Sequence, residues 1–343
     1  MAGEFQMHVV ELPHAAAGQR LDQALAAALP QYSRARLQRW IREGAVRLAG
    51  SGGAPGAGTA RARDRVRGGE RIEVRAEFSA DGNVEAQSLP LQIVLEDEAL
   101  LVLNKPAGLV VHPGAGNRSH TLQNALLAHD ERLARVPRAG IVHRLDKDTS
   151  GLLIVARTPQ SHTRLVAALA AREITREYLA LVWGHPVAGG RIEQPIGRDP
   201  RARTRMAVSR AGRAAVTHYR IEERLAAHTL LRVRLETGRT HQIRVHLAHI
   251  GLPIVGDPVY GGRRRRLADS AVNDALQAFQ RQALHAARLS LVHPVTGKLQ
   301  SFEVPPPEDL AALLRALRVP EPSPEQASRQ RRRATRVPLR RRS

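Results

Sequence analysis

The chain of 343 residues contains no cysteine. This absence excludes disulfide bonds, thiolate metal ligands, cysteine-ligated iron–sulfur clusters and cysteine nucleophiles. Long apolar stretches are also missing: the longest uninterrupted run, Leu165–Ala171, has seven residues, whereas a membrane span needs about 20. The N-terminal residues lack the basic and apolar segments of a secretory signal. We therefore expect a cytoplasmic protein without a membrane partner.

Acidic residues are scarce: the chain has 32 Asp and Glu but 53 Lys and Arg, which gives a formal net charge of +21. Hydrophobic residues make up 43 % and charged residues 25 %, a balance typical of globular proteins. The positive excess indicates a polyanionic partner, of which nucleic acid is the most common. Much of the charge lies in three clusters, although any one of them is equally compatible with a solvated surface. Their members are Arg34, Arg36, Arg39, Arg42 and Arg47; Arg198, Arg201, Arg203, Arg205, Arg210 and Arg213; and Arg263–Arg266.

The N-terminal part has the pattern of a small helical unit with a strand. Leucines recur every four residues from Leu21 to Leu29 and predict a helix that a proline ends. A second helix is expected after Ser33, which can cap it. The apolar stripe of this second helix consists of Leu37, Trp40 and Ile41. Residues 71–78 alternate between apolar and charged side chains and predict a half-exposed strand.

The region after residue 90 predicts an α+β fold with a mixed, largely antiparallel sheet and flanking helices. A hairpin is expected from residues 91–95 and 99–104, and helices at residues 122–129 and 161–172. Further strands are expected at residues 151–156, 178–183, 214–223, 229–236, 287–292 and 299–304. Because most of these strands follow one another without a regular helix between them, a parallel βαβ series is disfavoured.

These patterns divide the chain into five parts. The expected segments are an N-terminal segment 1–17, a small α+β domain 18–80, a linker 81–89, a large domain 90–318 and a tail 319–343. From residue 320 to the end the sequence holds eight arginines, two glutamates and four prolines, a net charge of +6. Such a segment cannot bury enough apolar surface to fold, so we expect a disordered basic tail.

The densest polar stretch, GIVHRLDKDTSG, spans residues 140–151 and precedes an apolar strand. Asp146 lies between Arg144 and Lys147, and such cations would keep a carboxylate ionised as a nucleophile. A plain turn, with Asp148 and its neighbours capping backbone donors, explains the composition equally well. Local chemistry alone leaves both interpretations open.

A second polar stretch, TGRTHQIRVHL, spans residues 237–247. Arg239 and Arg244 are candidates for pairing with phosphate or with a catalytic carboxylate. Three histidines lie in or beside the stretch, namely His241, His246 and His249. Their spacing matches no known metal motif, so structural histidines are favoured and no metal is expected. Tyr178, one of four tyrosines, fits a core position in a strand on its pattern alone.

Four motifs in the expected order resemble the RluA-type RNA pseudouridine synthases over about residues 90–305. They are LNKPAGLVVHPG, HRLDKDTSG, REYLALVWG and TGRTHQIRVHLAHIGLPIVGDPVYG. Residues 20–50 resemble the S-four-type RNA-binding domain, which precedes the catalytic domain in several members. The domain order and the linker are most similar to the subgroup that acts on the large ribosomal subunit.

This resemblance implies roles for particular residues. It makes Asp146 the catalytic aspartate and Arg244 the basic residue paired with it. Arg144 would enter the RNA and help to displace the target base, and Tyr178 would lie against the flipped uracil. Further substrate-binding residues are expected from their charge and position rather than from the resemblance: His143, Arg239, and Arg34, Arg39 and Arg42 of the arginine-rich second helix.

The reaction implied is the isomerisation of uridine to pseudouridine in 23S ribosomal RNA, without a cofactor. The expected partner is this RNA or its large-subunit precursor, bound by a monomer with no obligate protein partner. One alternative is a synthase of the same family that acts on other ribosomal or transfer RNA uridines. A second is a non-catalytic ribosome-assembly factor, which the intact HRLDKDTSG motif disfavours. A metal-dependent nuclease or glycosidase lacks a ligand set or a second carboxylate.

Overall fold

The structure, a computed structural model, describes most of the chain. The described residues are 5–29, 32, 34–48, 60–77, 84–114, 116–202, 205–225, 227–262 and 270–318. Several features of the sequence lie outside them: the basic tail, the capping residue Ser33, Arg203, Arg263–Arg266 and part of the linker.

The N-terminal module combines a three-stranded antiparallel sheet with two helices. Its elements are β1 (Phe5–Glu11), α1 (Leu21–Ala28), α2 (Arg34–Arg42), β2 (Val46–Leu48) and β3 (Arg71–Glu77). The strand order is β1–β3–β2, and both pairings are antiparallel. Leu25, Leu37, Trp40 and Val74 are buried in one core that both helices and the sheet share. The two expected helices and the expected strand are therefore present.

Strand β1 belongs to this module, although the sequence analysis set residues 1–17 apart from it. β1 pairs with β3 along its whole length, from Phe5 opposite Glu77 to Glu11 opposite Arg71. Leu12 and Ala16, which follow β1, are buried in the same core. The sequence analysis overlooked this strand, although Phe5, Met7 and Val9 alternate with Gln6 and His8. The apolar Met7 and Val9 lie on its exposed side.

The chain forms two compact units. The first consists of the described residues up to 178 together with residues 234–241 and 285–305. The second consists of residues 179–233, 242–284 and the described residues from 306 onward.

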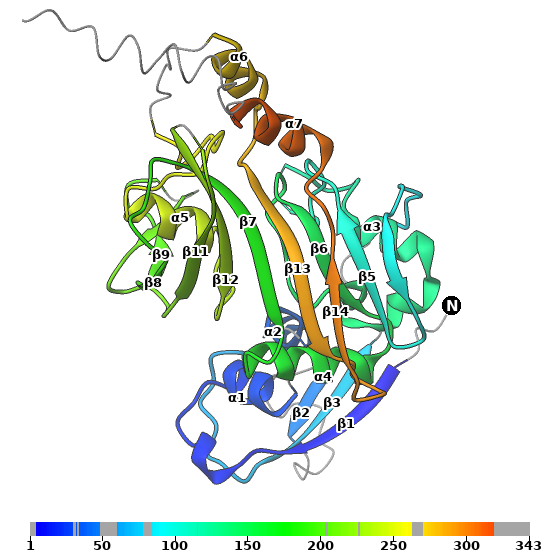
Figure 1. The fold of residues 1–343 in the computed structure, drawn as a ribbon. Coiled ribbons are helices and arrows are strands. Elements are labelled where there is room, and N and C mark those ends of the chain that lie inside the picture. The colour runs from blue at the N-terminus through cyan, green and yellow to red at the C-terminus, as the bar shows by residue number, and fades with distance from the viewer. Residues whose placement is uncertain are drawn as a thin grey trace, which may run out of the picture. The chain divides into compact units, whose positions relative to one another are not determined.

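Beyond the N-terminal module, the first unit contains a mixed sheet in the order β4–β5–β6–β13, with β14 paired to β13 (Figure 1). These strands are β4 (Ile93–Glu96), β5 (Leu100–Lys105), β6 (Ser150–Ala156), β13 (Leu284–Val292) and β14 (Leu299–Glu303). All pairings are antiparallel except that of β6 with β13. Helices α3 (Leu122–His129) and α4 (Pro159–Ala170) accompany the sheet, and Leu165 of α4 packs into a core with β5, β6 and β13.

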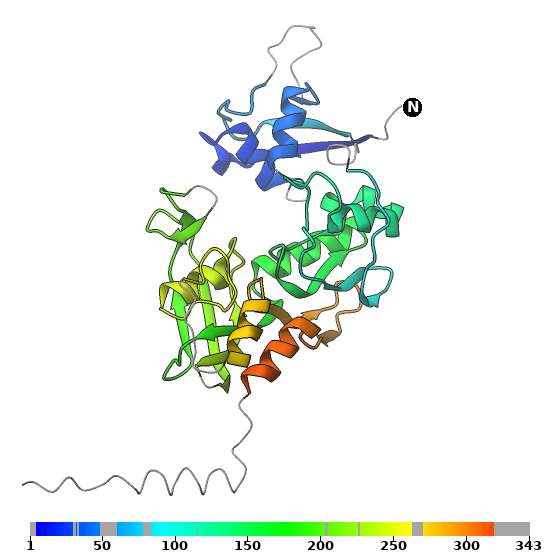
Figure 2. The same ribbon diagram turned by 90° about the horizontal axis from the view of Figure 1, so that it is seen from above.

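The second unit contains strands in the order β7–β12–β11–β8. They are β7 (Thr175–Trp183), which begins in the first unit, β8 (Gly190–Glu193), β11 (Val216–Arg224) and β12 (His228–Leu235). A separate hairpin joins β9 (Ile196–Arg198) and β10 (Met206–Val208). The helices are α5 (Gln242–His249), α6 (Ser270–Ala278) and α7 (Glu308–Leu317), and α6 packs beside α7 (Figure 2).

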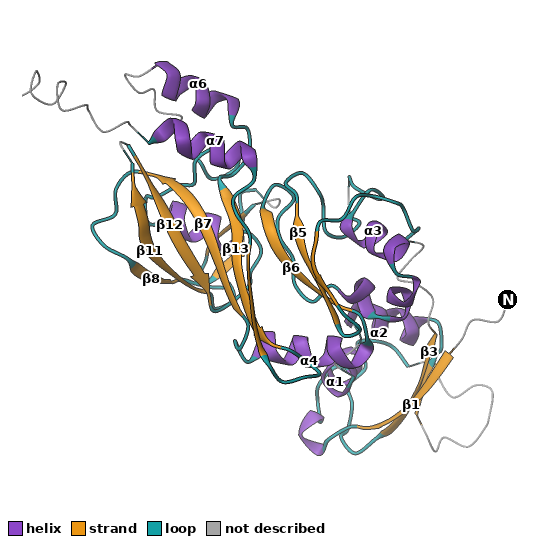
Figure 3. Ribbon diagram, turned by 45° about the vertical axis from the view of Figure 1, so that its right-hand side comes forward, coloured by secondary structure: helices purple, strands orange, loops and turns teal. Residues whose placement is uncertain are grey.

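The expected α+β class is confirmed, because antiparallel pairs dominate and helices flank the strands (Figure 3). Short 3₁₀ helices complete the fold: η1 (His14–Ala16), η3 (Glu131–Arg135) and η4 (Pro137–Gly140). The last of these leads directly into the polar loop that carries Asp146.

Candidate active site

The loop between η4 and β6 presents its side chains in alternation. Arg144 is exposed, Leu145 is buried, and the side chain of Asp146 retains 16 % of its accessible surface. Leu145 therefore anchors the loop, while its two neighbours remain accessible. Arg144 has no hydrogen-bond or ion-pair partner among the described residues, so its guanidinium is available to a ligand.

The side chain of Lys105, at the end of β5, stabilises this loop through a hydrogen bond to its backbone. Its side chain is almost fully buried, and Nζ donates hydrogen bonds to the carbonyl oxygens of Pro106, Leu109 and Lys147 at 2.7, 2.9 and 2.9 Å. The backbone N–H of Gly108 donates to the Lys147 carbonyl as well, at 2.9 Å. Because Lys147 follows Asp146 directly, these bonds fix the backbone next to the carboxylate.

The other end of the loop is fixed where β6 meets β13. Ser150 and Gly151 pair in parallel with His285 and Ala286, and the Ser150 hydroxyl hydrogen-bonds Nδ1 of His285 at 2.9 Å. Gly151 has a φ of +111°, and an added Cβ would lie 2.2 Å from the carbonyl oxygen of Ala286. Only glycine fits this position, since any side chain would force the two strands apart.

His241 lies beside the candidate catalytic carboxylate. Its Nε2 is 3.9 Å from Oδ1 of Asp146, and its backbone has a φ of +56°, which is rare for a residue other than glycine. Strained backbone of this kind is concentrated at functional sites. The sequence analysis treated His241 as structural, because its spacing from His246 and His249 fits no metal motif. Its proximity to Asp146, 95 positions earlier in the sequence, is a tertiary contact.

Tyr178 of β7 is buried in the same unit. Burial raises the pKa of Tyr178; nearby Arg176 opposes this effect, and Asp146 adds to it. The influence of Asp146 places the carboxylate and the phenol in one electrostatic environment. With its pKa raised above 10.0, the phenol remains protonated at neutral pH.

His143 is neutral in the folded protein. Burial, assisted by the positive charge of Arg176, lowers the pKa of His143 to about 3. Its Nε2 accepts a hydrogen bond from the backbone N–H of Ile154 at 3.1 Å, so the ring proton must lie on Nδ1. The Nδ1 atom is inaccessible and has no hydrogen-bond partner within the described structure.

Arg244 of α5 belongs to the second unit and is buried there. It forms a two-pronged ion pair with Asp257, with Nε–Oδ2 at 2.7 Å and Nη2–Oδ1 at 2.9 Å. Burial would raise the pKa of Asp257, but Arg244 and the backbone donors of Tyr260 and Val259 hold it below the usual value. The sequence analysis did not identify Asp257 as a partner, and the pairing of Arg244 with Asp146 stays a prediction.

The remaining predicted substrate-binding residues lie in two places. Arg239 is half-buried between β12 and α5. In the N-terminal module, Arg42 is exposed, and Arg39 lies 3.5 Å from Glu43. Arg34, by contrast, donates two hydrogen bonds at 3.0 and 2.8 Å to Asp22, which is 0 % exposed. Arg34 therefore has a structural task in addition to any contact with RNA.

The hydrogen bonds of His246 show what this histidine does in the fold. His246 uses both ring nitrogens in hydrogen bonds, to Thr217 and to the carbonyl of Gln194, each at 2.9 Å. This agrees with the structural role expected for it.

Among the residues that the structure describes, no group of three or more potential metal-ligating side chains occurs. Nor is any described helix long and apolar enough to cross a membrane.

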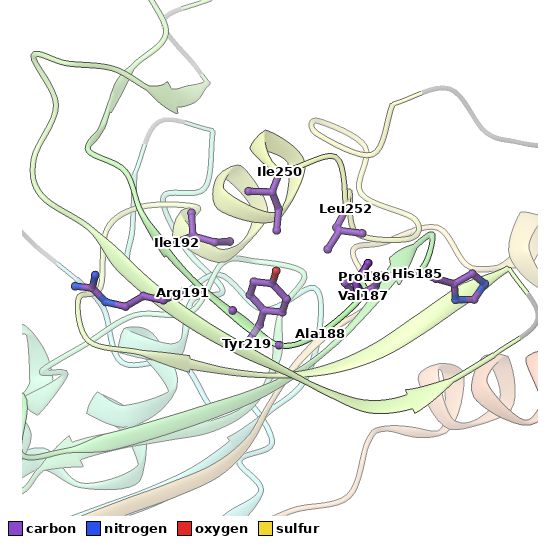
Figure 4. A pocket seen from close by; sticks show the side chains of 11 residues that line it. His185, Pro186, Val187, Ala188, Arg191, Ile192, Tyr219, Ile250 and Leu252 are labelled. Atoms are coloured by element: carbon purple, nitrogen blue, oxygen red, sulfur yellow. The ribbon is translucent and has the colours of Figure 1, made fainter.

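The second unit also contains a cavity of about 500 Å³ (Figure 4). The side chain of Tyr219 lies among Ile192, Ile250 and Leu252, and the segment from His185 to Arg191 completes the wall. None of the predicted site residues lines this cavity.

Comparison with known proteins defines the class. The model of the RNA pseudouridylate synthase family matches residues 99–249, and that of the S4 domain matches residues 19–51. The first range contains Asp146, Tyr178 and Arg244. Two human structures, RNA pseudouridylate synthase domain containing 1 and 4, are each 26 % identical to the chain, with TM-scores of 0.52 and 0.53. The alignments cover 74 and 68 % of this chain and 98 and 95 % of theirs.

Curated relatives match almost the whole chain. The ribosomal large subunit pseudouridine synthase D of Xanthomonas campestris pv. campestris is 52 % identical, over 90 % of this chain and 91 % of that protein. Its namesake from Pseudomonas aeruginosa is 53 % identical, over 90 and 95 % of the two chains. The chain therefore belongs to the RluA-type RNA pseudouridine synthases and is an enzyme of that class, as the four motifs predicted.

Proposed function

We propose that this protein converts uridine to pseudouridine in 23S RNA of the large ribosomal subunit. The identity of 52–53 % to relatives named for that subunit supports this substrate. The observation that carries the proposal is the placement of Asp146 on a rigid loop, with its carboxylate 3.9 Å from His241 and electrostatically linked to Tyr178.

The catalytic group we propose is the carboxylate of Asp146. During the reaction the N1–C1′ bond of uridine breaks, and the sugar carbon acquires positive character. An ionised carboxylate is suited to attack or stabilise such a centre. Lys105 holds the backbone next to Asp146, so the carboxylate is positioned before the substrate arrives.

The reaction is an isomerisation and conserves all atoms. After the N1–C1′ bond breaks, the uracil turns, and its C5 bonds to C1′. The proton on C5 is released, and N1 gains a proton, so no oxidant, reductant or leaving group is required. This balance is the basis for proposing a reaction without a cofactor.

Arg144 and Tyr178 would displace and bind the target base. A base within a helix must leave its stack before an enzyme can act on it. The exposed Arg144, two residues before Asp146, can occupy the vacated space, and the ring of Tyr178 offers a stacking face to the extruded uracil. His143 and Arg239 would contact the nucleotides beside it.

We further propose that the N-terminal module binds RNA outside the reacting nucleotide through Arg39 and Arg42, with the basic tail from residue 319 adding affinity. Residues 81–89 would link this module to the catalytic part. Since one chain supplies every proposed catalytic side chain, we propose a monomer without an obligate protein partner. Because its proposed substrate is ribosomal RNA, we propose that it acts in the cytoplasm.

The test is to map pseudouridine in total RNA from a strain that lacks this gene, by chemical labelling and primer extension. We expect specific pseudouridines to disappear from 23S RNA alone and to return when the gene is restored. Loss confined to transfer RNA or to the small subunit would assign a different target. An unchanged pseudouridine map would contradict the proposed function.

A further inference from the structure

Arg176 is a buried cation that has no counterion among the residues the structure describes. It lies on β7 with only 8 % of its surface exposed. Its Nε is inaccessible and makes no hydrogen bond, and its guanidinium forms no hydrogen bond or ion pair with any described residue.

The other buried arginines of the described chain are neutralised. Arg244 is paired with Asp257, and Arg281 donates two hydrogen bonds to Asp309 at 2.6 and 2.8 Å. An unpaired buried ion is strongly destabilising, and an arginine cannot relieve the cost by losing its proton. Among the buried arginines of the described residues, Arg176 is therefore the one whose guanidinium has no protein counterion and can take an anion from a ligand.

The position of Arg176 places this site within the candidate active site. Arg176 and Tyr178 are two residues apart on a strand, and both are buried, so they share one face. The charge of Arg176 acts on Tyr178 and on His143. Nδ1 of the buried His143 also has no hydrogen-bond partner among the described residues.

Gly238, which belongs to the TGRTHQIR motif, lies beside the guanidinium of Arg176. An added Cβ at this position would lie 3.1 Å from Nη1 of Arg176. A side chain there would crowd the guanidinium, so the glycine leaves the room that a ligand of Arg176 needs.

We infer that Arg176 binds a backbone phosphate of the RNA at the nucleotide undergoing reaction. The planar guanidinium presents paired donors that match the oxygens of a phosphate, and RNA supplies this anion at every nucleotide. Arg176 is thus a substrate-positioning residue, and the uncompensated charge is neutralised only when the substrate is bound. This inference rests on the proposed function and extends it to one more contact.

The first test compares stability with RNA affinity in the full chain. Arg176→Met removes the charge and keeps an unbranched but shorter side chain, while Arg288→Met makes the same change at an exposed arginine of β13 as a matched control. We expect Arg176→Met to keep or raise the melting temperature, because an uncompensated buried charge is removed. We expect its affinity for a 23S fragment with the target uridine to fall about 10- to 100-fold. A lower melting temperature would assign Arg176 a structural role and overturn the inference.

The second test identifies the phosphate. Single phosphates around the target uridine are replaced with neutral methylphosphonates, and the Kd of each RNA is measured with the wild-type protein and with Arg176→Met. At one position the replacement should weaken wild-type binding and leave the variant unaffected, since the contact is already lost. Additive losses at every position would contradict the inference. Both tests measure binding to RNA around the uridine that the mapping identifies. An unchanged pseudouridine map contradicts the proposed function, whereas additive losses contradict this inference alone.

Discussion

The ammonium group of Lys105 donates a 2.9 Å hydrogen bond to the carbonyl of Lys147, the residue that follows Asp146. The loop that carries Asp146 is therefore fixed by a charged group on β5, which is paired with β6. This arrangement joins the NKPAG motif to the HRLD motif through one side chain.

Lys105→Met should disturb the loop, because three carbonyl oxygens lose their donor in a buried environment. We expect a loss of about 1–3 kcal/mol in the free energy of unfolding, together with a lower kcat. Lys298→Met, at an exposed position, is the control and should change neither quantity. Chemical denaturation and single-turnover kinetics measure the two effects, and full activity in Lys105→Met would refute the positioning role.

The ion pair of Arg244 with Asp257 should contribute strongly to stability. Asp257→Asn leaves a buried guanidinium without its counterion, so we expect a cost of about 3–5 kcal/mol. Asp309→Asn also leaves a buried guanidinium, that of Arg281, but the Asp309 side chain is 50 % exposed and water reaches this pair, so the cost should be smaller, about 1–3 kcal/mol. Equal losses in urea denaturation would argue against this distinction.

The same pair predicts a pH dependence. The pKa of Asp257 is lowered in the folded state, so its contribution to stability is complete above the ordinary value of 3.8 and is lost as the pH falls below it. Asp257→Asn should therefore show a weaker loss of stability in acid than the wild-type protein.

Arg34 and Arg42 occupy the same helix and should respond differently to substitution by glutamine. Arg34→Gln deprives buried Asp22 of two hydrogen bonds, and we expect a loss of about 1–3 kcal/mol in stability. Arg42→Gln should leave stability unchanged but reduce the salt dependence of RNA binding by about one unit of log–log slope. Thermal melts and binding isotherms at several salt concentrations separate the two effects. A melting temperature of Arg34→Gln equal to that of the wild type would contradict the structural role assigned to Arg34.

Tyr178 should act through its ring. Tyr178→Phe keeps the stacking face and should retain the affinity for RNA, whereas Tyr178→Leu should weaken binding by about 1–3 kcal/mol. Because its pKa is raised above 10.0, the fraction of phenolate at neutral pH is very small. Since the ring and not the phenolate is proposed to act, the rate should not rise tenfold per pH unit between pH 7 and 9. Such a rise would show that the phenolate takes part.

Local patterns in the sequence predict the regular elements well. The four-residue spacing of leucines predicts α1, and the alternation of apolar and charged residues predicts β3. Helix α7 was overlooked, although Leu310, Leu313, Leu314 and Leu317 follow a helical spacing and are all buried. The hairpin of β9 and β10 has too few residues to produce a recognisable period.

The motifs predict Asp146, but its surroundings depend on tertiary contacts. His241 and Lys105 reach the loop from distant parts of the chain, and no local period indicates such proximity. Arg176 carried one usable signal, because it lies two residues before Tyr178 in a strand and must share its face. The absence of a partner for its charge is visible only in the folded structure.

The most direct test of the central claim is the activity of Asp146→Asn on the 23S fragment. Glu98→Gln, which removes an exposed carboxylate, serves as the control for charge. The account predicts that Asp146→Asn folds and binds the RNA but forms pseudouridine at least about 1,000-fold more slowly, while Glu98→Gln matches the wild type. Pseudouridine formation by Asp146→Asn at the wild-type rate would contradict the account.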